Sequence, residues 1–351
     1  LCADQEALAA QAPLAYSFPY TDTDRAVLLS FDREGPAQGR VCYLLGCLSY
    51  GRDDRRQGIR RWQQAVVRDP ELWQAHRCLA LGLMDECGDL TGARREIERA
   101  FALERSQGGA QPNGRLLLEL LQIRRKSGVP VEELLGLLDR FPETVDSRED
   151  LALQRLVLCN EAGRPEKTVE YLRSRVYHPY EGGEGIVVHA HILAWLQLAR
   201  KALAEGNPQQ AVSCCEKALE YPENYEEGRG VNAREAAVYY YMAKAQETMG
   251  HAQDARAWLE KAANHRTGNL DESDFYTGCA MRRLGREQEA AALYRSMLEQ
   301  ADRILREEDS LPYFGGFVSN LPGEHSVRIA NHRRAHPAKF YALTGLGRPE
   351  D

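Results

Sequence analysis

The stretch WLQLARKALAEGNPQQAVSCCEKALEYP, from Trp195 to Pro222, decides the fold. Apolar residues recur every three or four positions on both sides of Gly206, which is the spacing of an amphipathic helix. Gly206 suits a tight turn because glycine adopts backbone conformations that other residues avoid, and Pro222 ends the second helix because proline cannot continue one. Ala199 and Ala211 are small enough to let two helices cross closely. The stretch therefore predicts two antiparallel helices joined by a turn.

The same hairpin pattern recurs along the chain with a period of about 35 residues. Eight positions align on the turn, namely Asp53, Gly88, Gly128, Gly163, Gly206, Gly250, Gly285 and Gly347. The third pair (115–141) and the fourth pair (151–175) keep the helical spacing but lose the small residues. No run of alternating β-branched residues predicts a sheet. The repeats resemble the tetratricopeptide consensus, so we predict an all-α fold, a tetratricopeptide-like α-solenoid in which helical hairpins form a right-handed superhelix.

We predict four segments along the chain. Residues 1–38 break the pattern and cap the first hairpin, because the end repeats of a solenoid must cover an apolar face. Residues 39–180 carry hairpin repeats that are partly divergent, residues 181–310 carry tetratricopeptide-like repeats with long connections, and residues 311–351 carry a long loop and a C-terminal helix. The last residues read as a hairpin interrupted at its turn, so we expect a piece of a longer protein.

Composition excludes several classes of protein. The 351 residues include 45 Lys and Arg against 52 Asp and Glu, so the net charge is −7, and 43% of residues are hydrophobic. These values exclude disordered, collagen-like and membrane-embedded chains. A pI of about 5.8, without a basic stripe interleaved with aromatics, disfavours nucleic acid as a partner. The nine cysteines include no C-x-x-C pair, so we expect reduced, buried thiols and a cytoplasmic protein.

Three connections between hairpins are longer than the repeat needs, at 177–185, 221–230 and 311–335. Each combines aromatic residues with glycines, and two share the string Pro-Tyr-x-Gly-Gly. Because such connections emerge on one edge of a solenoid, we expect them to form a continuous rim that binds a ligand or partner. The candidate binding residues on this rim are His178, Tyr180, Glu181, Glu184, Tyr225, Glu227 and Phe314.

The residues of this rim could also bind a metal, catalyse a reaction or cap helices. The histidines and glutamates are metal-ligand types, but none has the H-E-x-x-H spacing on a helix, so we predict no metal and no cofactor. Glu181 with Glu184 or with Glu227 could act as general acid and base on a glycosidic bond, with tyrosines stacking on the sugar. The same carboxylates could instead cap the helices that follow them. No nucleophile and base stand in a recognisable order, so we assign no catalytic residue.

A second candidate surface lies on the first helices of the hairpins. By repeat position, the inward-facing residues of the later hairpins are Arg200, Tyr240, Lys244, Phe275 and Arg282, following Tyr43 and Tyr50 in the first. Cations mixed with aromatic rings could bind an acidic or aromatic peptide. The alternative is an ordinary solvated face.

Four stretches resemble a known family. They are Phe18-Pro19-Tyr20, Arg77 to Ala80, Tyr177 to Gly185, and Tyr221 to Arg229. They are similar to motifs in the tetratricopeptide region of large bacterial proteins whose upstream part is an uncharacterised β-sandwich, itself similar to galactose mutarotase-type domains. This chain departs from those motifs with Tyr180 for Trp, Cys78 for Asn and Tyr225-Glu226 for Leu-Gly. The resemblance implies a partner domain that handles carbohydrate.

The sequence thus predicts a non-enzymatic tetratricopeptide scaffold for protein–protein or interdomain interaction. We expect its partner to be a protein or peptide, chiefly an upstream domain of the same polypeptide, and we expect neither nucleic acid nor membrane. The alternative is the helical part of a larger carbohydrate-active or carbohydrate-binding protein. In that case the loops at 177–185, 221–230 and 311–325 would complete its site.

Overall fold

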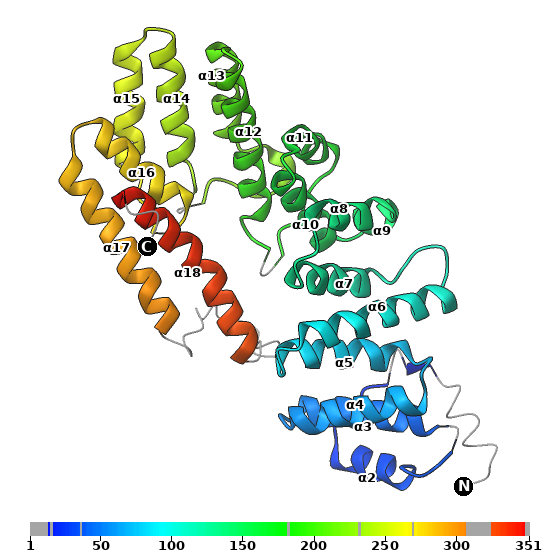
Figure 1. The fold of residues 1–351 in the computed structure, drawn as a ribbon. Coiled ribbons are helices and arrows are strands. Elements are labelled where there is room, and N and C mark those ends of the chain that lie inside the picture. The colour runs from blue at the N-terminus through cyan, green and yellow to red at the C-terminus, as the bar shows by residue number, and fades with distance from the viewer. Residues whose placement is uncertain are drawn as a thin grey trace. The chain divides into compact units, whose positions relative to one another are not determined.

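The computed structural model describes residues 13–14, 17–35, 37–180, 183–230, 233–268, 270–306 and 324–347, without the side chains of 324–330. Every regular element in these residues is a helix (Figure 1), so the predicted all-α class is confirmed. The chain divides into two compact units, the first ending at Ser147 and the second beginning at Arg148 and including the last helix from Val327 on. Each unit is built from antiparallel helical hairpins, as the tetratricopeptide-like pattern predicts.

The first unit consists of consecutive short helices. They are α2 (Asp22–Ser30), α3 (Gln38–Gly51), α4 (Arg55–Arg68), α5 (Trp73–Asp85), α6 (Leu90–Gln107), α7 (Gly114–Lys126), α8 (Val131–Asp139) and α9 (Pro142–Asp146). Glycines set the close crossing of α3 and α4. A Cβ added at Gly46 would lie 2.5 Å from the Trp62 ring, and one added at Gly58 would lie 2.8 Å from Cβ of Tyr50.

The second unit is built from helices in the same way. They are α10 (Glu149–Glu161), α11 (Pro165–Ser174), α12 (Ile186–Ala204), α13 (Pro208–Ala218), the 3₁₀ turn η2 (Glu223–Tyr225), α14 (Ala236–Thr248), α15 (Ala252–Ala263), α16 (Glu272–Arg283), α17 (Glu287–Arg306) and α18 (Glu324–Leu346). The divergent third and fourth pairs are therefore hairpins as well, α7 with α8 and α10 with α11.

The eight positions that the sequence aligned as turns are turns in the structure as well. All eight, from Asp53 to Gly347, have a positive φ between 65° and 83°. Glycine adopts this left-handed region without the steric cost that a side chain imposes, and Asp53 is the one position where another residue bears that cost. The repeat register predicted from the sequence is therefore correct at each turn.

Tyr294 of α17 shows how the last hairpins pack. Its ring lies between two glycines, so that a Cβ added at Gly278 of α16 would be 2.3 Å from it and one added at Gly345 of α18 would be 2.5 Å away. The Tyr294 hydroxyl donates to the carbonyl oxygen of Phe275 at 2.9 Å. α18 also contributes Ala335, Ala338 and Ala342 to the buried cluster that contains Tyr294. α18 thus takes the place of the first helix of a further hairpin.

Two further observations bear on the class of protein. Within the described residues, none of the helices combines the length and the apolar character that a membrane crossing requires. The cysteines of the same residues are free thiols, and most are at least half-buried.

Candidate functional site

Asn224 joins the two long connections of the second unit, 177–185 and 221–230. Its side-chain amide donates to the carbonyl oxygens of Leu172 at 2.9 Å and Arg175 at 2.8 Å, where α11 ends. Its own carbonyl accepts from the backbone N–H of Tyr177 at 2.8 Å. The last carbonyls of a helix have no partner inside the helix. Asn224 therefore caps α11 and anchors one connection to the other.

Tyr225 lies in the interior rather than on the rim. Its side chain is 3% exposed, and its hydroxyl lies 2.9 Å from Nδ1 of His191. Nε2 of His191 lies 2.7 Å from the Lys217 carbonyl oxygen, which can only accept, so Nε2 carries the proton and Nδ1 accepts from Tyr225. Burial lowers the pKa of His191, and the hydrogen bond to the Lys217 carbonyl offsets part of that effect. Tyr225 thus anchors its connection to α12.

Glu235 fixes both ends of the 221–230 connection. Its side chain is 1% exposed and accepts from the hydroxyls of Tyr221 at 2.5 Å and Tyr239 at 2.6 Å. Arg229 donates to both carboxylate oxygens, the shortest contact being 2.6 Å. Burial alone would raise the pKa of Glu235, but the hydrogen bonds from Arg229 and the two tyrosines outweigh it and hold the pKa at about 2. The carboxylate is therefore a structural anion.

Glu227 caps α12, the helix before it in the chain, whereas the helix-capping interpretation expected these carboxylates to cap the helices that follow them. Its Oε1 accepts from the backbone N–H of Gly185 at 2.8 Å, and Gly185 precedes α12 with a φ of 74°. A carboxylate at this end of a helix meets the positive pole of the helix dipole. Close by, a Cβ added at Gly183 would lie 2.6 Å from the ring of Tyr180, so a larger residue there would require that ring to move.

Other predicted rim residues lie at the surface. His178 contacts Glu226 through Nδ1 at 3.0 Å, with both side chains at least half exposed, and Tyr180 and Glu184 are exposed as well. Glu181 and Phe314 lie outside the described residues. Across the residues that are described, no three metal-ligating side chains gather at one point. The exposed set of His178, Tyr180 and Glu184 stays a predicted binding surface.

Arg200 is the centre of a second group, which we call the Arg200 cluster. It consists of Arg200 of α12, three α14 residues and three α16 residues, namely Tyr240, Tyr241, Lys244, Glu272, Phe275 and Tyr276. Arg200 forms an ion pair with Glu272 and donates to the Tyr276 hydroxyl at 3.3 Å. Its guanidinium lies 4.8 Å from the centre of the Tyr241 ring and 5.6 Å from that of Tyr276. One cation thus links three successive first helices.

The aromatic rings of the Arg200 cluster form a continuous, half-buried surface. Tyr240 lies 5.0 Å from Tyr276 between ring centres, and the hydroxyls of Tyr241 and Tyr276 are 3.0 Å apart. Phe275 contacts Tyr276 at 5.4 Å and Tyr341 of α18 at 5.5 Å. The sequence identified Arg200, Tyr240, Lys244 and Phe275, and the structure adds Tyr241, Glu272 and Tyr276. Helical spacing offered one signal for Tyr276, which follows Glu272 by four residues on α16.

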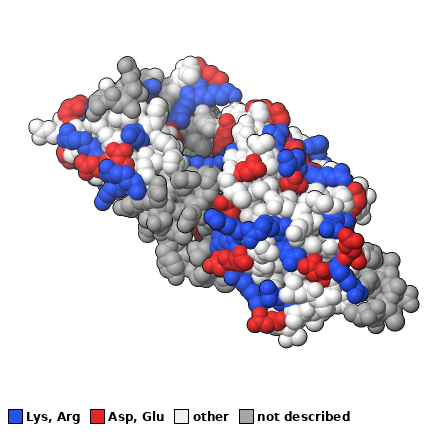
Figure 2. Space-filling model, turned by 60° about the horizontal axis from the view of Figure 1, so that its bottom comes forward, with Lys and Arg blue, Asp and Glu red and all other residues white. Residues whose placement is uncertain are grey.

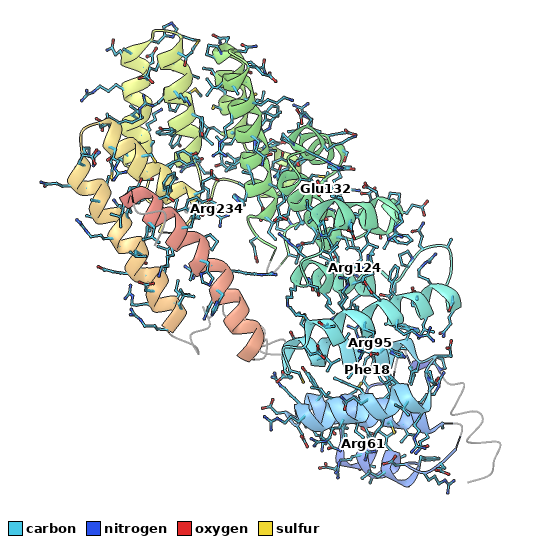
Figure 3. All side chains as sticks on the ribbon, viewed as in Figure 1. Phe18, Arg61, Arg95, Arg124, Glu132 and Arg234 are labelled. Carbon is cyan, nitrogen blue, oxygen red and sulfur yellow. The ribbon has the colours of Figure 1, made fainter. Side chains whose placement is uncertain are left out.

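The charges around this surface are unevenly paired. Arg282 lies outside the group, bound to Glu287 at 3.2 Å and above the Tyr294 ring. Lys244 is exposed, and no carboxylate of the described residues lies within ion-pair distance of it. Figure 2 shows basic and acidic side chains interspersed over the face it draws. Figure 3 places Arg234 in the segment that leads into α14, where it pairs with Asp271 at 2.6 Å.

No known family, compared by its sequence profile, matches the chain. Among solved structures, YrrB, a TPR protein with an unusual peptide-binding site, is similar over 57% of this chain and 93% of its own, with 13% identity and a TM-score of 0.40. PilW, a type IV pilus biogenesis factor, is similar over 64% of this chain and 91% of its own, with 14% identity and a TM-score of 0.35. Yeast Tom70 is similar over 96% of this chain and 64% of its own, with 13% identity and a TM-score of 0.36.

Proposed function

We propose that this chain is a non-enzymatic helical-repeat scaffold that binds a protein segment across the Arg200 cluster. The observation that carries the proposal is the half-buried layer of tyrosine rings around a cation that Glu272 already holds in place. Aromatic and arginine side chains dominate the energetics of protein interfaces. Because Arg200 is oriented before a partner arrives, binding loses less side-chain entropy.

The charge of the cluster favours an acidic segment. Glu272 balances Arg200, whereas Lys244 projects without a carboxylate among the described residues. Aspartate or glutamate in the partner would supply that carboxylate, and apolar or aromatic residues would cover the exposed ring faces. The ligand is therefore an acidic peptide segment with aromatic or aliphatic side chains.

The loop carboxylates support a structural role for the two connections. Glu235 is saturated by Arg229 and two tyrosines, and Glu227 caps α12. A general acid and base pair needs carboxyl groups that face a substrate. Glu227, one of the candidates for such a pair, faces the backbone of Gly185 instead, and Glu235, which was not a candidate, faces Arg229 and two tyrosines.

The source of the segment follows from the family resemblance. We infer that it belongs to an upstream domain of the same polypeptide, because the stretches 177–185 and 221–229 resemble those of proteins built in that order. The alternative, a carbohydrate ligand, would use the exposed Tyr180 and Glu184 together with such an upstream domain. A glycan array distinguishes the protein ligand from the carbohydrate ligand. It is probed with the whole chain, alone and fused to its upstream reading frame, and glycan binding would favour the carbohydrate.

The experiment that tests the proposal starts from a random peptide display library selected on the whole chain. We expect enrichment of acidic peptides with aromatic residues, and we expect Lys244→Glu to weaken the best peptide by about tenfold. Arg256→Glu is the matched control, since Arg256 is an exposed arginine on α15, the second helix of the same hairpin. Equal affinities for wild type and Lys244→Glu would overturn the proposal.

A further inference from the structure

We propose that the hydroxyl of Tyr241 donates a hydrogen bond to a side-chain carboxylate of the partner, which the ammonium group of Lys244 binds at the same time. The Arg200 cluster would then select aspartate or glutamate over asparagine or glutamine. This inference rests on the proposed function and deepens it, because it names the chemical group that the site recognises and adds Tyr241 as a residue that determines specificity. Two observations carry it: a count of the hydroxyl protons in the cluster and the position of Lys244.

Three side chains of the Arg200 cluster form a chain of hydrogen bonds. Arg200 donates through Nη2 to the hydroxyl oxygen of Tyr276 at 3.3 Å, and the hydroxyl oxygens of Tyr276 and Tyr241 are 3.0 Å apart. A guanidinium only donates, so the two tyrosines keep both of their hydroxyl protons. One of these protons lies between the two oxygens. The other has no acceptor in the part of the chain that the structure describes.

The order of the chain assigns the free proton to Tyr241. A hydroxyl that accepts from a cation becomes a stronger donor, because hydrogen bonds in a chain polarise one another. Tyr276, which accepts from Arg200, therefore donates to Tyr241. Burial raises the pKa of Tyr276, and the hydrogen bond to Tyr241 raises it further, as expected for the hydroxyl that donates. The hydroxyl of Tyr241 is thus left as a donor for a ligand.

Lys244 provides a cation next to this donor. It follows Tyr241 by three residues on α14, so the two side chains lie on the same side of the helix. Nζ of Lys244 is 6.0 Å from the centre of the Tyr241 ring. Lys244 is exposed, and Glu247, three residues further along α14, pairs with Arg283 instead. A hydroxyl donor and an ammonium donor therefore stand side by side.

A carboxylate fits this pair of donors better than an amide does. An ionised carboxylate has two oxygens that only accept, so one accepts from Tyr241 and the other from Lys244 in charge-assisted hydrogen bonds. A carboxamide has one oxygen and would turn its N–H₂ group toward the second donor. Glu272 does not compete for these donors, because its carboxylate is paired with Arg200.

The test compares two fluorescein-labelled peptides, each titrated against the whole chain by anisotropy. The first consists of alternating glutamate and serine with a central Trp-Leu pair, and the second has glutamine in place of every glutamate. We expect Tyr241→Phe, which keeps the ring and removes the proton, to weaken the glutamate peptide about tenfold and the glutamine peptide less than about twofold. Tyr276→Phe should weaken the glutamate peptide by less than Tyr241→Phe does, because the Tyr241 proton remains.

Tyr341→Phe is the matched control. It removes a hydroxyl from a ring of α18 that contacts Phe275 but lies outside the Arg200 cluster, so it should leave both affinities within about twofold. Lys244→Glu tests the proposed function itself in the same assay, and it should weaken the glutamate peptide about tenfold.

The outcomes separate this inference from the proposed function. If Lys244→Glu weakens the glutamate peptide but Tyr241→Phe weakens both peptides equally, or neither, the role of the Tyr241 hydroxyl is refuted and the proposed function stands. A larger loss with Tyr276→Phe than with Tyr241→Phe would refute it as well, since the free proton would then belong to Tyr276. A glutamate peptide that does not bind, or that binds Lys244→Glu as tightly as the wild type, would overturn the proposed function and this inference together.

Discussion

Glu235→Gln should destabilise the second unit because Glu235 holds both ends of the 221–230 connection. The carboxylate accepts from Arg229, Tyr221 and Tyr239 while being 1% exposed. Glutamine keeps the shape but removes the charge and turns an N–H₂ group toward one of these donors. Removing one partner of a buried ion pair leaves the other uncompensated, although Arg229 is half exposed and recovers part of that cost in water.

The size of the effect follows from the pKa. The folded pKa of Glu235 is about 2, against an ordinary value of 4.5. At about 1.36 kcal/mol per unit, the shift corresponds to about 3 kcal/mol of stability at pH 7. Because the folded pKa is depressed, this stability is fully present above pH 4.5 and is lost as the pH falls toward 2. Less than half of it, about 1.4 kcal/mol, remains at pH 3.

Urea unfolding followed by tryptophan fluorescence measures this loss of stability. Trp258 reports on the region because its ring stacks on that of Tyr239, 5.8 Å away between ring centres, and Tyr239 donates to Glu235. We expect Glu235→Gln to lower the free energy of unfolding by about 2–4 kcal/mol at pH 7 and by much less at pH 3. Glu220→Gln is the control, because the exposed Glu220–Lys217 pair should contribute under about 0.5 kcal/mol. A loss below about 0.5 kcal/mol for Glu235→Gln at pH 7, or a loss that is independent of pH, refutes the reasoning.

Further predictions test the fold and the rim. Asn224→Ala removes the cap of α11 and should lower the melting temperature, with a cost of about 1–3 kcal/mol, and unchanged melting would contradict the interlocked connections. Gly278→Ala should destabilise by several kcal/mol by urea unfolding, since its Cβ meets Tyr294, whereas Gly136→Ala has open space and should be neutral or stabilise by up to about 1 kcal/mol. Chelator or reductant should leave the melting temperature unchanged, and a drop of several degrees with either would reveal a metal or a disulfide. Replacing exposed Tyr180 and Glu184 together by Ala should cost under about 1 kcal/mol while weakening association with an upstream domain or glycan, and earlier melting with unchanged binding would assign them a purely structural role.

The repeat architecture could be predicted because its signals are local. Each turn position is set by a backbone conformation that glycine tolerates, and the helices on either side are set by apolar spacing. The divergent hairpins α7–α8 and α10–α11 were recognisable by spacing alone, without their small residues. Local propensity and tertiary packing therefore agree over most of the chain.

The interlocked connections could not be predicted because their contacts are distant in sequence. Asn224 bonds to Leu172 and Arg175, 52 and 49 residues earlier, and Tyr225 bonds to His191, 34 residues earlier. Sequence marked Tyr225 as a rim residue because an aromatic in a glycine-rich loop often serves binding. Its burial shows that a long connection can be held by packing across hairpins, which no local pattern encodes.

The most direct test of the proposed function places a photo-crosslinking residue, p-benzoylphenylalanine, at position 240, where it replaces one aromatic ring of the Arg200 cluster by another and leaves Lys244 in place, and, in separate proteins, at positions 256 and 180. Each protein is irradiated with the acidic peptide that library selection yields on the whole chain. The account predicts a crosslink from position 240 and none from position 256 on α15 or position 180 on the 177–185 connection. A crosslink from position 180 alone would contradict it and place the binding surface on the connections instead of the Arg200 cluster.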